Sequence, residues 1–361
     1  MRWGTGRRTL AGMSLRIAPV SVDDPASIDA WVEVVERIRE YEFPYLPART
    51  RRMAELMFEH AFPARAVEHQ LAWVDGEPAG RLEVSRMTED NLKVLSFTIE
   101  VAPRFRRRGV GRALFGEVLA YAREHGRTVL VTGASLSMPG LPAPDEAPGA
   151  FAAALGFTNT LPELQRRLTL AEVDEDVLAG MLAAAQAKAT GYRLVRWRDA
   201  APEELAEGVA YLDSRLMSDA PTGDLQIEAE KPDVARMRRV EEVIAARGRR
   251  TFHTGAVDEQ TGALVAWTTI SNDDETPWHA WQQITIVDPD HRGHRLGALV
   301  KVENLRFFRA EMPQVEVVDT FNAAENGYMI AINEQMGFRK LAAFQNWQRD
   351  LAKDGSTATA E

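Results

Sequence analysis

The chain has 361 residues, with 43 Lys and Arg against 53 Asp and Glu, a formal net charge of −10 and no cysteine. The lack of cysteine excludes disulfides, thiolate metal sites and a cysteine nucleophile. The acidic balance disfavours nucleic-acid binding. No apolar run is long enough to span a membrane, and the first residues lack the apolar core of a secretory signal. We therefore expect a cytoplasmic protein of two domains that contacts neither nucleic acid nor membrane.

The first half of the chain predicts alternating short strands and helices. Ser14–Pro19 has the pattern of a strand, and Ile28–Tyr41 has that of a helix. Ala72–Val84 contains a Gly-Glu turn between two apolar runs, which predicts a strand, a turn and a strand. Leu95–Val101 predicts a further strand, and an amphipathic helix follows it.

The same order of elements occurs a second time. Tyr192–Trp197 and Gln283–Val287 predict strands, and each half closes on a Gly-Phe pair, at Gly156 and at Gly337. A repeated order predicts two similar modules rather than two unrelated domains. We expect an N-terminal domain over residues 14–188 and a C-terminal domain over residues 189–351. Residues 1–13 and 352–361 are expected to be disordered.

A basic loop with two glycines follows the strand that ends at Val101. It opens a helix, and a helix N-terminus offers unsatisfied N–H groups and a positive dipole end to an anion, while guanidinium groups bind phosphate oxygens. A Walker loop needs Gly-Lys-Ser/Thr, and the dinucleotide fingerprint needs a third glycine where Leu114 stands. The expected phosphate-binding residues are Arg106, Arg107, Arg108, Gly109, Val110, Gly111 and Arg112.

A second loop of the same kind follows the strand that ends at Val287. Arg295 takes the place that Gly109 has in the first loop, and Gly293 supplies backbone freedom two residues earlier. The corresponding phosphate-binding residues are Arg292, Gly293, His294, Arg295, Leu296 and Gly297.

The spacing Arg-x-x-Gly-x-Gly, placed between a strand with Val-x-Pro and a helix, resembles the pyrophosphate loop of the GNAT superfamily of N-acetyltransferases. The resemblance extends from residue 14 to about residue 350. It implies an α/β (α+β) protein with two GNAT-fold modules in tandem, each a mixed, mostly antiparallel sheet that is splayed at the coenzyme site and flanked by helices. It also implies acetyl-CoA as coenzyme and direct attack of an amine within a ternary complex. In the family, the coenzyme contact that stabilises the oxyanion comes from the strand before the loop, which here ends at Val101 in the first half and at Ile286 and Val287 in the second.

The resemblance also locates a proton donor, which is usually a tyrosine five residues before the Phe of Gly-Phe. Ala152 has this position in the first half and Asn333 in the second. Asn326, seven residues before Asn333, matches the family asparagine that contacts the coenzyme, and Asn322 is a second candidate for that role. Tyr328 is a candidate for a displaced acid. For Asn333, a helix-capping or core hydrogen bond is the alternative to a contact with the coenzyme.

The two halves therefore differ. Mycothiol synthase is a similar tandem protein whose C-terminal half carries the chemistry, and on that analogy we expect catalysis by Asn333 and Tyr328 in the second half. The first half would bind coenzyme structurally or bind nothing. No base is assigned, because Glu100 and Gln283 occupy the relevant strands and glutamine is not a base.

The resemblance implies a small-molecule amine as acceptor. In GNAT folds the early helices line the acceptor pocket. In the second half, Asp219 and Asp224 follow such a helix and could hold an ammonium group, although aspartates beside Pro and Gly are also ordinary turn residues. No metal site is expected, because the seven histidines are scattered without a ligand spacing.

Two other functions stay open. A non-catalytic acyl-CoA-binding or sensing protein would explain the missing tyrosines. An enzyme that modifies nucleic acid is disfavoured by the net charge. Turnover of acetyl-CoA with an amine distinguishes the enzyme from the sensor.

Overall fold

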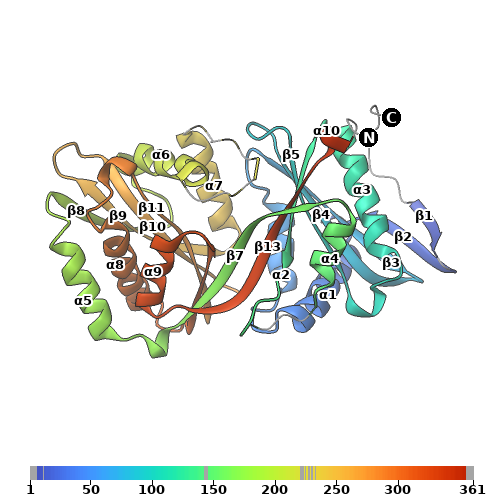
Figure 1. Cartoon of the computed structure of the whole chain (residues 1–361), viewed down its shortest axis with the longest axis horizontal. Helices are drawn as coiled ribbons and strands as arrows, with labels where there is room; N and C mark the ends of the chain where they lie inside the picture. The colour runs from blue at the N-terminus through green and yellow to red at the C-terminus, as the bar shows by residue number, and fades with distance from the viewer. Residues whose placement is uncertain are drawn as a thin grey trace. The chain divides into compact units, whose positions relative to one another are not determined.

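The computed structural model describes residues 6–10, 12–141, 145–219 and 233–354, together with residues 223, 225, 226, 228 and 231. The chain divides into two compact units. Unit 1 holds residues 1–161, 224–227 and 344–361, and unit 2 holds residues 162–223 and 228–343. Each unit is a mixed sheet with helices on its faces, which confirms the predicted fold class (Figure 1).

Unit 1 has the strand order β1-β2-β3-β4-β5-β6-β13. Its elements are β1 (Gly6–Leu10), β2 (Met13–Pro19), α1 (Pro25–Glu42), α2 (Arg51–Glu59), β3 (Arg65–Val74), β4 (Glu77–Met87), β5 (Val94–Val101), η1 (Pro103–Phe105), α3 (Val110–Glu124), β6 (Val129–Ser135), α4 (Ala147–Ala154), β13 (Arg339–Asp350) and α10 (Leu351–Asp354). Alternate residues of β3 join different cores. Ala72 packs with α3 and Leu71 packs with α1, so these helices cover opposite faces.

Unit 2 has the strand order β7-β12-β11-β10-β9-β8. Its elements are β7 (Thr158–Thr169), η2 (Leu170–Glu172), α5 (Glu175–Gln186), β8 (Tyr192–Arg198), α6 (Glu203–Asp219), α7 (Val234–Ala246), β9 (Arg249–Asp258), β10 (Leu264–Asp273), β11 (His279–Val287), η3 (Pro289–His291), α8 (Leu296–Glu311), β12 (Val317–Ala323) and α9 (Gly327–Met336). Ala266 packs with α5 and α8, and its neighbour Trp267 packs with α6. The two faces of this sheet are thus covered as in unit 1.

Each sheet is completed by a strand from the other half of the sequence. Phe344–Asp350 of β13, red in Figure 1, pair with β6, and Glu163–Thr169 of β7, green, pair with β12. In unit 2, the buried Asp319 of β12 accepts two 2.7 Å hydrogen bonds from Arg167 of β7 and one of 2.9 Å from His279 of β11. A buried carboxylate needs such partners, so this network fixes β7 in the second sheet.

The ends of the chain differ from the sequence prediction. Gly6–Leu10 pair with β2 as a short hairpin whose turn contains Gly12 at a φ of 84°, although no ordered structure is predicted there. Leu351–Asp354 form a short helix at the start of the predicted C-terminal tail. Asp224, a predicted acceptor residue, lies outside the described residues.

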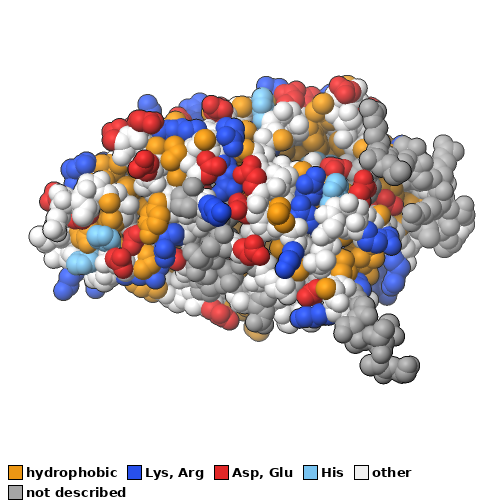
Figure 2. All heavy atoms as spheres, turned by 90° about the horizontal axis from the view of Figure 1, so that it is seen from above, with side chains coloured by type: hydrophobic (Ala, Val, Ile, Leu, Met, Phe, Trp, Pro, Cys, Tyr) orange, Lys and Arg blue, Asp and Glu red, His pale blue; other side chains and the backbone are white. Residues whose placement is uncertain are grey.

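The surface carries charges of both signs. In Figure 2, Lys and Arg side chains are interspersed with Asp and Glu side chains over the visible face. No helix in the described part of the chain is both long enough and apolar enough to cross a membrane.

Candidate active site

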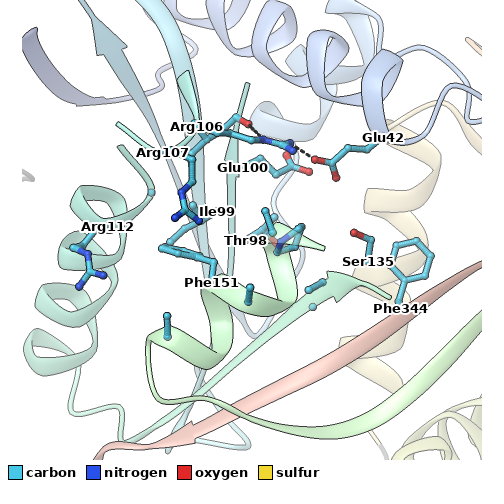
Figure 3. Close-up of a pocket in the computed structure, with 18 of the residues that line it drawn as sticks. Glu42, Thr98, Ile99, Glu100, Arg106, Arg107, Arg112, Ser135, Phe151 and Phe344 are labelled. Carbon is cyan, nitrogen blue, oxygen red and sulfur yellow. Dashed lines mark hydrogen bonds and ion pairs between the residues drawn. The ribbon is translucent and has the colours of Figure 1, made fainter. Parts of the chain in front are cut away.

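The sheet of unit 1 opens into a fork between two parallel strands. β5 and β6 pair from Val94–Val129 to Ser96–Val131 and then diverge. A cavity of about 650 Å³ begins at this fork. Its walls are residues of β5, β6, α4, β13, the end of α1 and the loop before α3, and they include Glu42, Thr98, Ile99, Glu100, Val101, Gly133, Ala134, Ser135, Ala150, Phe151 and Phe344. Figure 3 shows Ser135 beside Phe344 at one end and Arg112 at the other.

The N-terminus of α3 forms the polar end of the cavity. Gly109 caps the helix at a φ of 87°, and the first intrahelical bond is the one from Ala113 to the Gly109 carbonyl, so the N–H groups of Gly111 and Arg112 have no partner within the helix. Of the residues predicted for this loop, Val101, Arg106, Arg107, Gly109, Gly111 and Arg112 line the cavity. Val110 is instead buried in the core, and Arg108 is exposed. This end is suited to an anion such as a diphosphate.

Arg106 is held by protein groups rather than directed freely into the cavity. It donates to the Val101 carbonyl at 2.9 Å and to Asp145 at 2.9 Å, and it also pairs with Glu42 at the end of α1 (Figure 3). Burial raises the pKa of Glu42, and the Arg106 guanidinium only partly opposes this effect. Glu100 pairs with the buried Arg81. Glu42 and Glu100, which line the cavity, therefore both have guanidinium partners.

The loop of unit 2 repeats the backbone of the first loop with the glycine moved. In unit 1, Arg107 and Gly109 have φ values of 61° and 87°, and in unit 2, Gly293 and Arg295 have values of 89° and 56°. Each loop thus has two left-handed positions and places one glycine and one arginine in them. This is why Arg295 can replace Gly109 at the N-cap of α8. Arg292, His294 and Arg295 are exposed.

Asp219 has the same task in unit 2 that Glu42 has in unit 1. It ends α6, as Glu42 ends α1, and it accepts from the loop residue Arg292 at 3.1 Å and from Arg215 at 2.9 Å. The sequence predicts Asp219 as an ammonium ligand, and the structure places its carboxylate between the guanidinium groups of Arg215 and Arg292.

The fork of unit 2 differs from that of unit 1 by a β-bulge. β11 pairs with β12 from His279–Val317 to Trp281–Asp319 and then diverges. On its other side, the pairing of β11 with β10 shifts, so that Thr269 faces both Gln283 and Ile284. Gln282 holds the bulge by donating to Thr268 Oγ1 at 3.0 Å and to the Thr269 carbonyl at 2.9 Å. β4 and β5 pair without any such shift.

The closing helix of unit 2 carries three of the predicted residues, Asn326, Tyr328 and Asn333, and a fourth, Asn322, lies on β12. Asn333 is fully buried and donates to Asn322 Oδ1 at 2.7 Å, while its own Oδ1 has no hydrogen-bond partner among the described residues. Asn326 caps α9 by accepting from the Met329 N–H at 3.2 Å. Tyr328 is 62% exposed, and its ring lies beside Gly297, where a β-carbon would be 3.8 Å from it.

The sequence does not show that Glu42 and Asp219 anchor the loop arginines, and it does not show the bulge on β11. Glu42 lies more than fifty residues from Arg106 in the sequence, and nothing in a single sequence relates the two. The bulge depends on the register of β10 against β11, which local pattern does not specify.

Comparison with known proteins shows which family has this architecture. The profile of the acetyltransferase (GNAT) family matches residues 31–137. The solved structure of a tandem GNAT protein from the clavulanic acid biosynthesis pathway is 31% identical, with a TM-score of 0.79 over 93% of this chain and 98% of that one. The chain belongs to the GNAT family. It is an acyltransferase with the tandem GNAT organisation that the sequence predicts.

Two more distant solved structures share the fold. A GCN5-related N-acetyltransferase from Sphaerobacter thermophilus is 14% identical with a TM-score of 0.63 over 93% of this chain and 96% of that one. A glucosamine N-acetyltransferase region of a fungal multi-domain β-N-acetylglucosaminidase is 14% identical with a TM-score of 0.65 over 93% of this chain and 38% of that one. No curated protein matches the chain.

The GNAT fold implies a coenzyme A thioester, and the residues of unit 1 fit one. The free N–H groups at α3 suit the diphosphate, and the fork between β5 and β6 gives a slot for an extended chain. No group of three or more metal-ligating side chains occurs within the described ranges.

Proposed function

We propose that this GNAT protein transfers the acetyl group of acetyl-CoA to a small-molecule amine by direct attack in a ternary complex, and that unit 2 carries the chemistry. The observation that supports unit 2 is the bulge on β11 at Gln283 and Ile284. A bulge leaves one residue unpaired in the ladder, and bulges are common beside active sites. An unpaired backbone N–H at the fork is suited to stabilise the charge that develops on a thioester oxygen.

Unit 1 is better suited to holding coenzyme than to chemistry. Its cavity and α3 N-terminus fit the ligand, but Glu42 and Glu100 are both ion-paired with arginines. Ala152, at the position of the family's proton donor, is buried in the core. A unit with a binding slot and no free acid or base would bind acetyl-CoA without turning it over.

Several residues of unit 2 have proposed roles at the coenzyme. The exposed N-terminus of α8, with Arg292, Arg295 and Gly297, would hold the diphosphate. Tyr328 beside Gly297 would contact the bound coenzyme, and the Asn322–Asn333 pair would position the inner wall of the slot. The relative from clavulanic acid biosynthesis, whose pathway makes a small molecule, supports a small-molecule acceptor.

The test is turnover of acetyl-CoA with a panel of amines. The panel contains amino sugars, aminoglycosides, polyamines and short peptides, and free thiol release is followed for each amine with an enzyme-free control. We expect thiol release with at least one member and an acetylated amine of matching amount by mass spectrometry. Thiol release without an acetylated amine would argue against transfer.

One observation favours a second function, a coenzyme-sensing role. The ion-paired carboxylates and Ala152 leave unit 1 with a binding site that has no catalytic groups of its own. If acetyl-CoA raises the melting temperature and no amine in the panel is acetylated, the sensing role is the correct one.

A further inference from the structure

The cavity of unit 1 crosses its sheet from one face to the other. Ile99 of β5 packs with the core under α3. Its neighbour Glu100 pairs with Arg81, and the Arg81 guanidinium lies 5.4 Å from the centre of the Trp31 ring of α1. Both Ile99 and Glu100 line the cavity, and successive residues of a strand point to opposite faces. The cavity therefore has one part on the α3 face of the sheet and one part on the α1 face.

The part on the α1 face lies at the end opposite the anion site. Leu130 of β6 packs in the core under α3, so Gly133 and Ser135, an odd number of residues further on, are on the α1 face. Ser135 and Arg112 lie at opposite ends of the cavity (Figure 3). We call the part on the α1 face the inner compartment, and its lining includes Phe43, Thr98, Gly133, Ser135 and Phe344.

The far wall of the inner compartment is aromatic. Phe344 of β13 pairs with Ser135 in the sheet, and its ring stacks on that of Phe43, the C-cap of α1, with 5.8 Å between the ring centroids. Beside this wall, a β-carbon at Gly133 would have no heavy atom within 4 Å other than those of its chain neighbours. The inner compartment thus combines an apolar wall with open space next to it.

One hydroxyl in the inner compartment lacks a partner. The Oγ of Ser135 is buried and forms no hydrogen bond with any described residue. Buried hydroxyl groups normally have a hydrogen-bond partner. The only polar group of a straight acyl chain is its carbonyl, which Ser135 can serve as a donor. The compartment therefore offers one donor for a carbonyl and an apolar wall for the carbons beyond it.

The charged groups around the inner compartment carry a net negative charge at neutral pH. Two arginines are shared among four carboxylates, in the pairs Arg106 with Glu42 and Asp145, and Arg81 with Glu83 and Glu100. Burial raises the pKa of Glu42, but three carboxylates remain against two guanidinium groups even when Glu42 is protonated. An acyl group that ends in a carboxylate is repelled by this arrangement.

Unit 2 has a different residue at the position of the aromatic wall. Ser135 and Ala323 each lie six residues after the first residue of their strand that pairs across the fork. Phe344 pairs with Ser135, and Glu163 of β7 pairs with Ala323. A residue with a carboxylate thus stands where unit 1 has a phenylalanine.

From this geometry, and on the basis of the coenzyme site proposed for unit 1, we infer that unit 1 selects CoA thioesters with an uncharged straight acyl chain longer than acetyl. The diphosphate binds at the N-terminus of α3, the chain of the coenzyme crosses the sheet at the fork, and the acyl group enters the inner compartment. Its carbonyl accepts from Ser135, and its further carbons lie against Phe43 and Phe344. Unit 1 then distinguishes acyl groups by length and charge, and unit 2 does not.

The experiment compares three thioesters on one protein. The Gly297→Glu protein, whose unit 2 site is blocked, is titrated with acetyl-CoA, butyryl-CoA and succinyl-CoA by isothermal calorimetry. We expect butyryl-CoA to bind about 15-fold more tightly than acetyl-CoA, from about 0.8 kcal/mol for each of two further buried methylenes. Succinyl-CoA has as many acyl carbons as butyryl-CoA but ends in a carboxylate, and it should bind roughly tenfold or more weaker than butyryl-CoA.

Variants locate the preference in the inner compartment. Gly133→Leu in the same protein fills the open space beside the aromatic wall and should remove most of the preference for butyryl-CoA. Gly180→Leu is the matched control, because Gly180 is an exposed glycine of α5 that also has open space around its β-carbon position, and this variant should keep the preference. The Gly111→Glu protein, which retains only the unit 2 site, should show no preference for butyryl-CoA.

The outcomes separate the inference from the proposed function. Equal affinities for acetyl-CoA and butyryl-CoA, or tightest binding of succinyl-CoA, would overturn the inference alone. The same preference for butyryl-CoA in the Gly111→Glu protein, or its survival in Gly133→Leu, would also overturn it, because the inner compartment would not be the cause. If the Gly297→Glu protein binds none of the thioesters, the coenzyme site proposed for unit 1 is wrong and the inference fails with it.

Discussion

Replacing Lys301 by Met should stabilise unit 2, and the gain should depend on pH in a defined direction. The pKa of Lys301 is about 7 in the folded protein, against 10.5 for an ordinary lysine. Below about pH 7 the lysine is charged in both the folded and the unfolded state, so the cost of burying the charge is present in full. That cost is roughly 5 kcal/mol, from about 1.4 kcal/mol per pKa unit.

The cost falls as the pH rises. Between the two pKa values the folded lysine is neutral while the unfolded one still binds a proton, so the stability of the natural protein increases with pH. The Met variant has no such group. The difference in free energy of unfolding between the variant and the natural protein should therefore shrink by roughly 3 kcal/mol between about pH 6 and about pH 9.

Urea denaturation followed by circular dichroism measures this difference. The transitions of the two units are fitted separately, because a chain of two units need not unfold in one step. Lys340→Met is the matched control and should show no pH-dependent difference, since that side chain is exposed. A gap for Lys301→Met that stays constant from acid to alkaline pH would refute a pKa near 7, and with it the argument from burial.

Two further predictions concern the loops and the exchanged strand. Gly293→Ala should destabilise the protein by about 1 kcal/mol or more, because Gly293 has a φ of 89°. Arg295→Gly should be neutral or stabilising by up to about 1 kcal/mol, because it removes an arginine from a left-handed backbone position. Thermal unfolding of both variants measures the two effects, and equal losses of stability would contradict the shared loop backbone. Asp319→Asn should cost roughly 3–5 kcal/mol at neutral pH, because it leaves the Arg167 guanidinium without its buried partner. Arg167 and His279 hold the pKa of Asp319 below its usual value against the opposing effect of burial, so this loss, measured by urea denaturation, should shrink as the pH falls through the carboxyl pKa; a loss that does not change in acid would count against the network.

The sequence predicts most of the fold because each motif of the repeat is visible within a short segment. Two loops with the same spacing, each between a strand and a helix, and two closing Gly-Phe pairs predict the paired modules. The closing glycines have a physical reason, since Gly337 ends α9 at a φ of 104°. The exchange of β7 and β13 between the sheets could not be predicted, because strand pairing over such separations has no local signal.

The site was predictable where backbone chemistry defines it and not where side chains from distant elements meet. Gly109 and Gly111 at a helix start predict an anion site from the sequence alone, and both residues line the cavity of unit 1. Away from the loops, the burial of Lys301 of α8 against Phe338 also has no local signal in the sequence. The sequence could not show that Arg215 and Arg292 both donate to the carboxylate of Asp219.

Turnover of two loop variants shows which unit carries the chemistry. Glu at position 111 or 297 places a carboxylate at the N-terminus of α3 or α8, where it would repel a diphosphate. Free thiol release is measured for both variants with acetyl-CoA and the best amine of the panel. We predict that Gly297→Glu abolishes turnover and that Gly111→Glu retains it. Loss of turnover in Gly111→Glu alone would place the chemistry in unit 1 and contradict catalysis by unit 2.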